Sequence, residues 1–177
     1  MGQINGQDME TIRNTNQKIN EMKQVRRKVV DAAAYIGAIR ELVLEGNDVP
    51  MTITGSSMNP LLIHGRDTII ISKPDRPLKK GDMVFYQRDN GRFVMHRICK
   101  VKKTSDGKVL FDIIGDAQTE IEKNVREDQI FGLITKICRK GKWIEPGDFW
   151  WAFFEKAWLH MIPVRRIVMR LYNTVSK

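Results

Sequence analysis

A serine and a histidine stand in sequence contexts that could form a hydrolytic site. Ser57 lies in the run Gly55-Ser-Ser-Met-Asn-Pro60, and His96 lies in the apolar, strand-like run Phe93-Val-Met-His-Arg-Ile98. A serine hydroxyl is a poor nucleophile at neutral pH unless a neighbouring base accepts its proton, and an imidazole with an ordinary pKa of ~6.5 suits that task. The sequence therefore predicts nucleophilic catalysis if the fold brings Ser57 and His96 together.

The segments that must position these two residues change character at Pro50. Between about Met22 and Glu45, apolar residues recur every three or four positions, which predicts one buried face of a helix that ends at Gly46-Asn47. The first twenty residues lack this stripe and are predicted to be disordered or frayed. After Pro50, short runs rich in β-branched and aromatic residues predict strands at 51–54, 67–72, 83–87, 92–101, 109–114 and 130–138.

Turn-forming residues separate the predicted strands, and Asn90-Gly91 is the clearest hairpin turn. We therefore expect a mainly β (β+α) fold, with a compact antiparallel β core, an N-terminal amphipathic helix and C-terminal helices. The expected divisions are a flexible segment plus helix at 1–48, the β domain at 49–145, and an aromatic and basic helical tail at 146–177.

Along its predicted strand, His96 shares a face with Val94 and Ile98. An apolar environment disfavours the charged imidazole, which suits a neutral general base. His64 and His160 match no such pattern and are predicted to be structural or surface residues. Cys99 and Cys138 fall in apolar alternating runs without a CxxC motif or a Cys/His cluster, so we expect both to be reduced core residues. No metal site or cofactor is expected.

The chain has 177 residues, a size suited to one domain with a terminal extension, and its formal net charge is +9. No window approaches the ~20 consecutive apolar residues of a membrane-spanning helix, and the N-terminus lacks the pattern of a secretory signal. These features predict a cytoplasmic protein. The basic excess is concentrated at the C-terminal end, where residues 139–177 hold eight basic and three acidic side chains.

Several short motifs occur in a fixed order along the middle of the chain. They are Gly55-Ser-Ser-Met-Asn-Pro60, Gly65-Arg-Asp67, Gly81-Asp82, His96-Arg97, Gly115-Asp116 and Gly132. In this order and spacing the chain resembles the signal peptidase I and SOS-repressor superfamily of serine peptidases, and specifically its histidine-containing signal-peptidase branch. The resemblance covers about residues 54–137.

The resemblance implies a role for each matching residue. Ser57, the serine before the methionine, corresponds to the nucleophile, and His96 corresponds to the histidine that replaces the lysine base of other members. Asp116 corresponds to the aspartate that would orient the imidazole. A second acidic residue normally follows, and this chain offers Glu120 and Glu122 instead of an aspartate, so the third member of the site stays open.

The resemblance also implies how the peptide substrate would be held near Ser57. Gly55 occupies the position where some members carry a hydroxyl, so Ser56 or backbone N–H groups would stabilise the oxyanion. Met58 and Pro60 are expected to shape the apolar wall beside the scissile bond. Arg97 is expected to pair with a local acidic group and to hold its strand.

Three functions remain open from the sequence. The first is a serine endopeptidase that cleaves a leader, signal or precursor peptide bound as an extended strand. The second is a catalytically inactive peptide-binding or regulatory module with the same fold. The third is a repressor-like DNA-binding protein, which the basic excess could suggest; because one helix of balanced charge precedes the core in place of a helix-turn-helix, nucleic-acid binding is not favoured.

A membrane partner is a separate question. Signal peptidases that resemble this core carry a transmembrane anchor before the Ser-Met motif, whereas this chain carries an amphipathic helix there. Residues 149–171 combine three tryptophans with three arginines, a composition that suits peripheral contact with a membrane surface. The other interpretation is that these aromatic residues cover the core of the β domain.

Overall fold

The computed structural model describes residue 21 and residues 32–175, except for the side chains of residues 166, 171–173 and 175. Clustering of contacts divides the chain into two compact units, Met1–Ala38 and Ile39–Lys177. The predicted frayed segment and the start of the predicted N-terminal helix lie outside the described residues. All the motifs named above belong to the second unit, which is the subject of the following sections.

The first described helix covers residues 32–44 and ends where the sequence predicts. Gly46 has a φ of +96°, and its N–H donates to the Val43 carbonyl at 3.0 Å. The Asn47 N–H donates to the Leu42 carbonyl at 3.1 Å, which completes a Schellman-type helix end. Ile39 and Val43 are buried one turn apart, so this end of the predicted apolar stripe is packed, whereas Ala32 is exposed and Val25 and Val29 lie outside the described residues.

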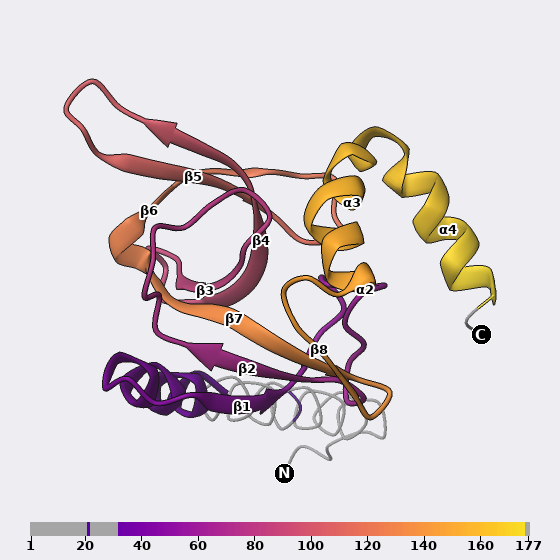
Figure 1. Cartoon of the computed structure of the whole chain (residues 1–177), viewed down its shortest axis with the longest axis horizontal. Coiled ribbons are helices and arrows are strands. Elements are labelled where there is room, and N and C mark those ends of the chain that lie inside the picture. The colour runs from indigo at the N-terminus through magenta and orange to yellow at the C-terminus, as the bar shows by residue number, and fades with distance from the viewer. Residues whose placement is uncertain (1–20, 22–31, 176–177) are drawn as a thin grey trace, which may run out of the picture. The chain divides into compact units, whose positions relative to one another are not determined.

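An antiparallel β-sheet of eight strands makes up most of the second unit (Figure 1). Seven strands lie in the order β1-β2-β7-β3-β4-β5-β6, and β8 pairs with the end of β7. The bounds are β1 Val49–Thr52, β2 Thr68–Ser72, β3 Met83–Gln87, β4 Phe93–Lys103, β5 Val109–Ile114, β6 Glu122–Arg126, β7 Ile130–Arg139 and β8 Lys142–Ile144.

The mainly β fold with a few helices is therefore confirmed, and each predicted strand has a counterpart. The Asn90-Gly91 turn joins β3 to β4 as predicted, in a register that pairs Val84 with His96. Two strands were missed. In β6 only Val125 is buried, so its sequence gives no apolar alternation, and β8 is too short for a pattern.

The core beneath His96 is apolar. Val84, Tyr86, Ile98, Phe111 and Ile113 are among the buried residues of one continuous cluster, and Val94 packs against it. The side chains that flank His96 along β4 thus enter the core, as the alternation predicts. This core fixes the strands that carry the candidate site.

Helices follow the sheet at the C-terminal end and belong to the same compact unit. In order they are α2 Phe149–Ala152, a π-helical turn η2 Phe153–Ala157, α3 Trp158–His160, a 3-10 turn η3 Ile162–Val164 that contains Pro163, and α4 Arg165–Val175. Short 3-10 turns also include η1 Glu127–Gln129, which leads into β7. Figure 1 shows α2, α3 and α4 gathered at the side of the sheet reached by the loop between β5 and β6.

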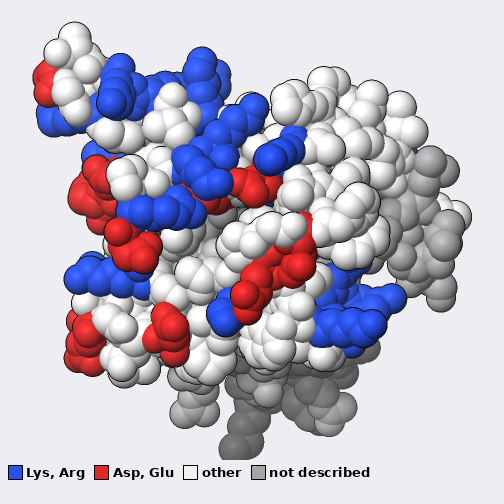
Figure 2. Space-filling view, in the orientation of Figure 1, with Lys and Arg blue, Asp and Glu red and all other residues white. Residues whose placement is uncertain are grey.

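The aromatic residues of this region divide into two groups. Trp151, Phe154 and Trp158 are buried, which confirms that part of the tail covers the core, whereas Phe149 and Trp150 are 74% and 48% exposed. Figure 2 shows a largely uncharged surface over these helices, in contrast to the mixed charges over the sheet. Among the described residues, no helix has the length and apolar character needed to cross a membrane.

Candidate active site

Ser57 lies on a tight turn between β1 and β2. Gly55 has a φ of +87°, which favours glycine, and its N–H donates to His64 Nδ1 at 3.1 Å. His64 is therefore a structural residue of this turn, as predicted. Because this bond occupies the Gly55 N–H, Gly55 does not supply a free oxyanion donor. Ser57 is half-buried, and its neighbour Ser56 is exposed.

The remaining residues of the Ser57 motif serve mainly to anchor the turn. Met58 is only 2% exposed and lies in the core, so it does not form the wall of an open pocket. Pro60 is half-buried, and its carbonyl accepts a hydrogen bond from Arg139 Nη2 at 3.3 Å. Of the positions expected to contact substrate, Met58 is thus a buried anchor, whereas Ser56 is exposed and Ser57 is half-buried.

The loop that follows β5 holds the Ser57 backbone directly. The Ala117 N–H donates to the Ser57 carbonyl at 2.8 Å. A Cβ atom placed on Gly115 would stand 2.7 Å from the same carbonyl oxygen, closer than side chains tolerate. Glycine at position 115 therefore permits the close approach that brings the Gly-Asp motif beside the Ser57 motif.

His96 lies on β4 with its side chain 4% exposed. The Tyr86 ring on the adjacent strand lies with its centroid 6.3 Å from the imidazole centroid. Burial, and then the positive charge of Arg88, lower the pKa of His96 from 6.5 to about 4, while Glu122 and Asp116 oppose that shift. The ring is therefore neutral at pH 7, the protonation state that a general base requires.

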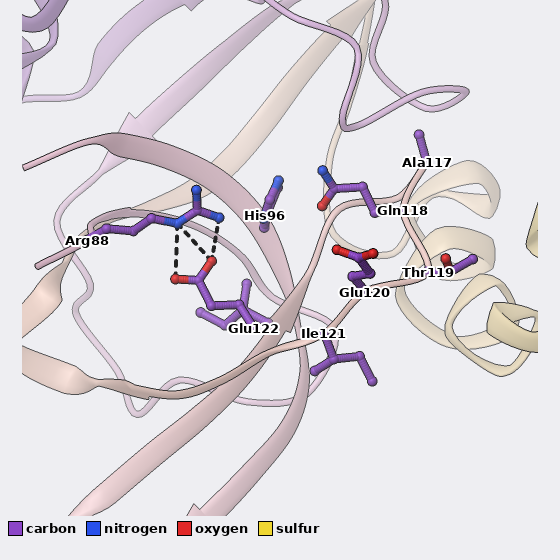
Figure 3. A pocket seen from close by; sticks show the side chains of 9 residues that line it. Arg88, His96, Ala117, Gln118, Thr119, Glu120, Ile121 and Glu122 are labelled. Atoms are coloured by element: carbon purple, nitrogen blue, oxygen red, sulfur yellow. Dashed lines mark hydrogen bonds and ion pairs between the residues drawn. The ribbon is translucent and has the colours of Figure 1, made fainter. Parts of the chain in front are cut away.

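His96 opens onto a pocket between the β3–β4 hairpin and the segment that leads into β6 (Figure 3). The pocket has a volume of about 430 Å³. Its lining residues are Arg88, His96, Ile113, Ala117, Gln118, Thr119, Glu120, Ile121 and Glu122. Ala117 thus lines the same cavity as His96 and bonds to the Ser57 backbone, so it links the two sequence motifs.

An ion pair forms one wall of this pocket. Arg88 Nε donates to Glu122 Oε2 at 2.9 Å, and the Tyr86 hydroxyl donates to the same oxygen at 2.7 Å. Burial opposes ionisation of Glu122, but the bonds from Arg88 and Tyr86 outweigh it and lower the pKa of Glu122. Figure 3 shows the Arg88–Glu122 pair on one side of the His96 ring and Gln118 on the other.

Asp116 occupies a different position from the one that the resemblance implies. Both of its carboxylate oxygens are bonded to Arg97, through Nε at 2.9 Å and Nη2 at 2.8 Å, and both side chains are buried. Arg97 thus has the acidic partner that the sequence predicts. Asp116 influences His96 only through its charge, because its oxygens are directed to Arg97.

The structure connects the Ser57 motif to the His96 pocket through Ala117 without joining the two reactive side chains. No hydrogen bond links the Ser57 hydroxyl to the His96 ring, and Ser57 is not among the residues that line the His96 pocket. A rearrangement of side chains is therefore needed before Ser57 could transfer its proton to His96. Apo sites often have such loose geometry and tighten when substrate binds.

Several residues at this site carried no signal in the sequence. Arg88 lies just after a predicted strand, and nothing in its context indicates contact with residue 122, which is 34 positions away. Tyr86 could have been placed near His96 from the Asn90-Gly91 hairpin register. Two residues from the C-terminal helices, Trp158 and Arg165, also bond to the Gly115–Gln118 loop.

Among the described residues, no cluster of three or more His, Cys, Asp or Glu side chains could hold a metal ion.

Comparison with known proteins leaves the family unassigned. No protein-family model matches the chain, and no curated protein sequence is significantly similar to it.

Proposed function

We propose that this protein is a serine endopeptidase in which Ser57 is the nucleophile and His96 is the general base. The observation that carries the proposal is the position of Ala117, which bonds to the Ser57 carbonyl at 2.8 Å and lines the pocket onto which His96 opens. The loop that holds the half-buried Ser57 thus also lines the pocket of a neutral imidazole, and the order of motifs around the two residues resembles that of signal peptidases.

The reaction follows from the chemistry of these two groups. The Ser57 hydroxyl attacks the carbonyl carbon of the scissile bond and passes its proton to the neutral His96 ring. The C–N bond breaks as His96 returns that proton to the leaving amine, which leaves an acyl ester on Ser57. Water then attacks the ester, with His96 again accepting and returning the proton, and the free serine is regenerated.

Glu122 is the better candidate for the acidic member of the site. Its charge has a larger effect on His96 than that of Asp116, and it lines the same pocket. Arg88 moderates this effect, because it bonds to Glu122 and lies close enough to lower the pKa of His96. Glu122 therefore would stabilise the imidazolium that forms as Ser57 attacks.

The substrate that suits this site is a peptide in an extended conformation. The pocket lies beside the segment 117–121, which connects β5 to β6, the last strand of the sheet. An extended peptide can pair its backbone with such an exposed segment while one of its side chains enters the pocket. This agrees with cleavage of a leader, signal or precursor peptide.

A second function is favoured by one observation. The absence of a Ser57–His96 hydrogen bond in the described part of the chain suits a module that binds peptides in the pocket and does not cleave them. The two functions differ in the reactivity of Ser57, because only the endopeptidase needs an activated hydroxyl.

The test is covalent labelling of the whole chain with a small fluorophosphonate, followed by mass spectrometry of the modified peptide. We expect one modification at Ser57, which Ser57→Ala abolishes and His96→Gln slows by about 10²-fold or more. Ser105→Ala is the matched control, because this hydroxyl is exposed on the turn between β4 and β5 and has no assigned role. Incubation with a random decapeptide mixture then tests cleavage. Labelling that is absent, or that persists in Ser57→Ala, would favour the binding module.

A further inference from the structure

Two buried side chains of the C-terminal segment, defined here as residues 149–170, reach the loop that holds Ser57. Trp158 lies on α3 and is 3% exposed, and Arg165 begins α4 and is fully buried. Both bond to the Gly115–Gln118 loop. The contact therefore connects the last helices of the chain to the wall of the candidate active site.

Arg165 directs its guanidinium to backbone carbonyls. Its Nη1 donates to the carbonyls of Gly115 at 2.9 Å and Gln118 at 3.0 Å, and its Nη2 donates to the Trp158 carbonyl at 3.0 Å. The guanidinium also lies 5.2 Å from the centroid of the Trp158 ring. Burying a cation is costly, so a sequence that only needed to fill this space would be served by an apolar residue. Its position indicates a role in fixing the loop.

Trp158 completes this attachment. Its Nε1 donates to the Asp116 carbonyl at 2.9 Å, so the carbonyls of residues 115, 116 and 118 all accept hydrogen bonds from the C-terminal segment. The remaining loop residue, Ala117, donates its N–H to the Ser57 carbonyl. The loop is thus held through its carbonyls by one part of the chain, and it holds the Ser57 turn through its N–H.

The C-terminal segment has a second attachment, through Glu155, to the chain around Gly81. Lys79 Nζ bonds to Glu155 at 2.5 Å, and Glu155 packs directly against Gly81, where a Cβ would collide with it. The Gly81 carbonyl accepts a hydrogen bond from Arg97 Nη1 at 2.8 Å. The C-terminal segment therefore contacts two of the motifs that surround the site.

We propose that Arg165 and Trp158 are positioning residues for the nucleophile, which they hold in place through the Gly115–Gln118 loop. The inference rests on the proposed peptidase function for its effect on rate, but its structural content is independent of catalysis. Loss of the guanidinium frees the loop carbonyls, and the Ala117–Ser57 bond then loosens. Displacements of about 1 Å at a nucleophile can lower rates by 10²-fold.

The experiment compares Arg165→Met, Arg165→Lys and the control Arg170→Met in the full-length chain. Arg170 lies on the same helix and is exposed. Two readouts are taken at a temperature where circular dichroism shows each variant to be folded. The first is the rate of Ser57 labelling by a small fluorophosphonate, and the second is hydrogen exchange of the Ala117 amide measured by NMR.

We expect Arg165→Met to slow labelling by about 10- to 100-fold and to speed exchange at Ala117, with Arg165→Lys intermediate and Arg170→Met unchanged. Folded Arg165→Met with wild-type labelling and wild-type exchange would overturn the inference. If Ser57 of the wild-type protein is not labelled, the proposed function fails, and exchange at Ala117 alone decides the positioning role: faster exchange supports it and unchanged exchange overturns it.

If Arg165→Met does not fold, Trp158→Phe replaces it, because phenylalanine keeps an aromatic ring in the core and removes the bond to Asp116. Faster exchange at Ala117 and slower labelling in this variant support the inference. Unchanged values of both overturn it.

Discussion

Gly115 lies against the carbonyl of Ser57, at a distance that leaves no room for a side chain. We predict that Gly115→Ala displaces the Ser57 turn, because the new methyl group would stand 2.7 Å from that oxygen and 2.8 Å from Gln118 Oε1. The expected cost in unfolding free energy is about 1–3 kcal/mol, with a fall of about 10- to 100-fold in Ser57 labelling.

The matched control for this prediction is Gly37→Ala, since a Cβ at Gly37 would meet no described atom within 4 Å outside the backbone of its own helix. Urea unfolding and fluorophosphonate labelling measure the two effects. If the Gly115 variant is labelled as fast as the Gly37 variant, the close approach of Gly115 to the Ser57 carbonyl has no bearing on the reactivity of Ser57.

Asp116 should matter more for stability than for proton transfer. Asp116→Asn leaves the Arg97 charge buried without its carboxylate, which is expected to cost about 3–5 kcal/mol of unfolding free energy. Asp106→Asn, which removes an exposed pair with Lys108, is the control and should cost far less, because solvent screens exposed pairs. Urea denaturation of both variants makes the comparison. Equal losses would contradict a buried, stabilising role for Asp116.

The buried imidazole of His96 makes folding dependent on pH. Its pKa is about 4 in the folded protein and 6.5 when unfolded, so between these values the unfolded chain binds a proton that the folded chain does not. Stability is therefore expected to fall as the pH drops from 6.5 to 4, by about 3 kcal/mol in total.

Two measurements check this dependence. NMR titration of the ring should show His96 uncharged at pH 5. The slope of unfolding free energy against pH should also be shallower in His96→Gln than in the wild-type protein. A His96 ring that titrates near pH 6.5 would be incompatible with this prediction.

After burial, the charge of Arg88 is the next influence on the pH at which His96 becomes protonated. Its charge is the largest electrostatic contribution that lowers the pKa of His96, and its removal also leaves Glu122 free to stabilise the imidazolium. Arg88→Met is therefore expected to move the pKa of His96 upward from about 4, and the acidic limb of Ser57 labelling should move to higher pH with it. Arg92→Met, an exposed change in the same hairpin, should leave both unchanged.

Contact with a membrane surface through the tail would use its exposed apolar side chains, among which Phe149 and Trp150 form an aromatic pair. Phe149 and Trp150 lie edge to face with ring centroids 5.4 Å apart, and the Arg139 guanidinium lies 5.3 Å from the Trp150 centroid. Arg165 does not contribute a surface charge, because it is buried. We expect the full chain to float with phosphatidylglycerol liposomes and not with neutral ones, and Phe149→Ser/Trp150→Ser to lower binding by about tenfold or more.

The double variant is a sharper test than truncation before residue 149, because truncation also removes buried aromatic residues from the core. Trp151, Phe154 and Trp158 would be lost with the tail. Equal flotation of the wild-type chain and the double variant would remove membrane contact through these residues.

Much of the local structure could be predicted because local sequence determines it. The Asn90-Gly91 turn fixed the pairing of β3 with β4, and alternation along β4 placed His96 on the face of Val94 and Ile98. The glycine at position 46 marked the end of the first helix. Burial of His96, and hence the direction of its pKa shift, followed from the same alternation.

The partners of charged side chains could not be predicted, because they depend on contacts between segments far apart in the chain. Only the tertiary structure decided that Asp116 pairs with Arg97, that Glu122 pairs with Arg88, and that Arg165 is buried against the Gly115–Gln118 loop. The spacing of apolar residues indicates which face of a strand or helix is buried. It does not indicate which carbonyl or carboxylate from a distant segment packs against that face. The sequence by itself thus determined most of the strands and the Ser57 and Gly115-Asp116 motifs. The folded chain decided how closely these two motifs approach each other.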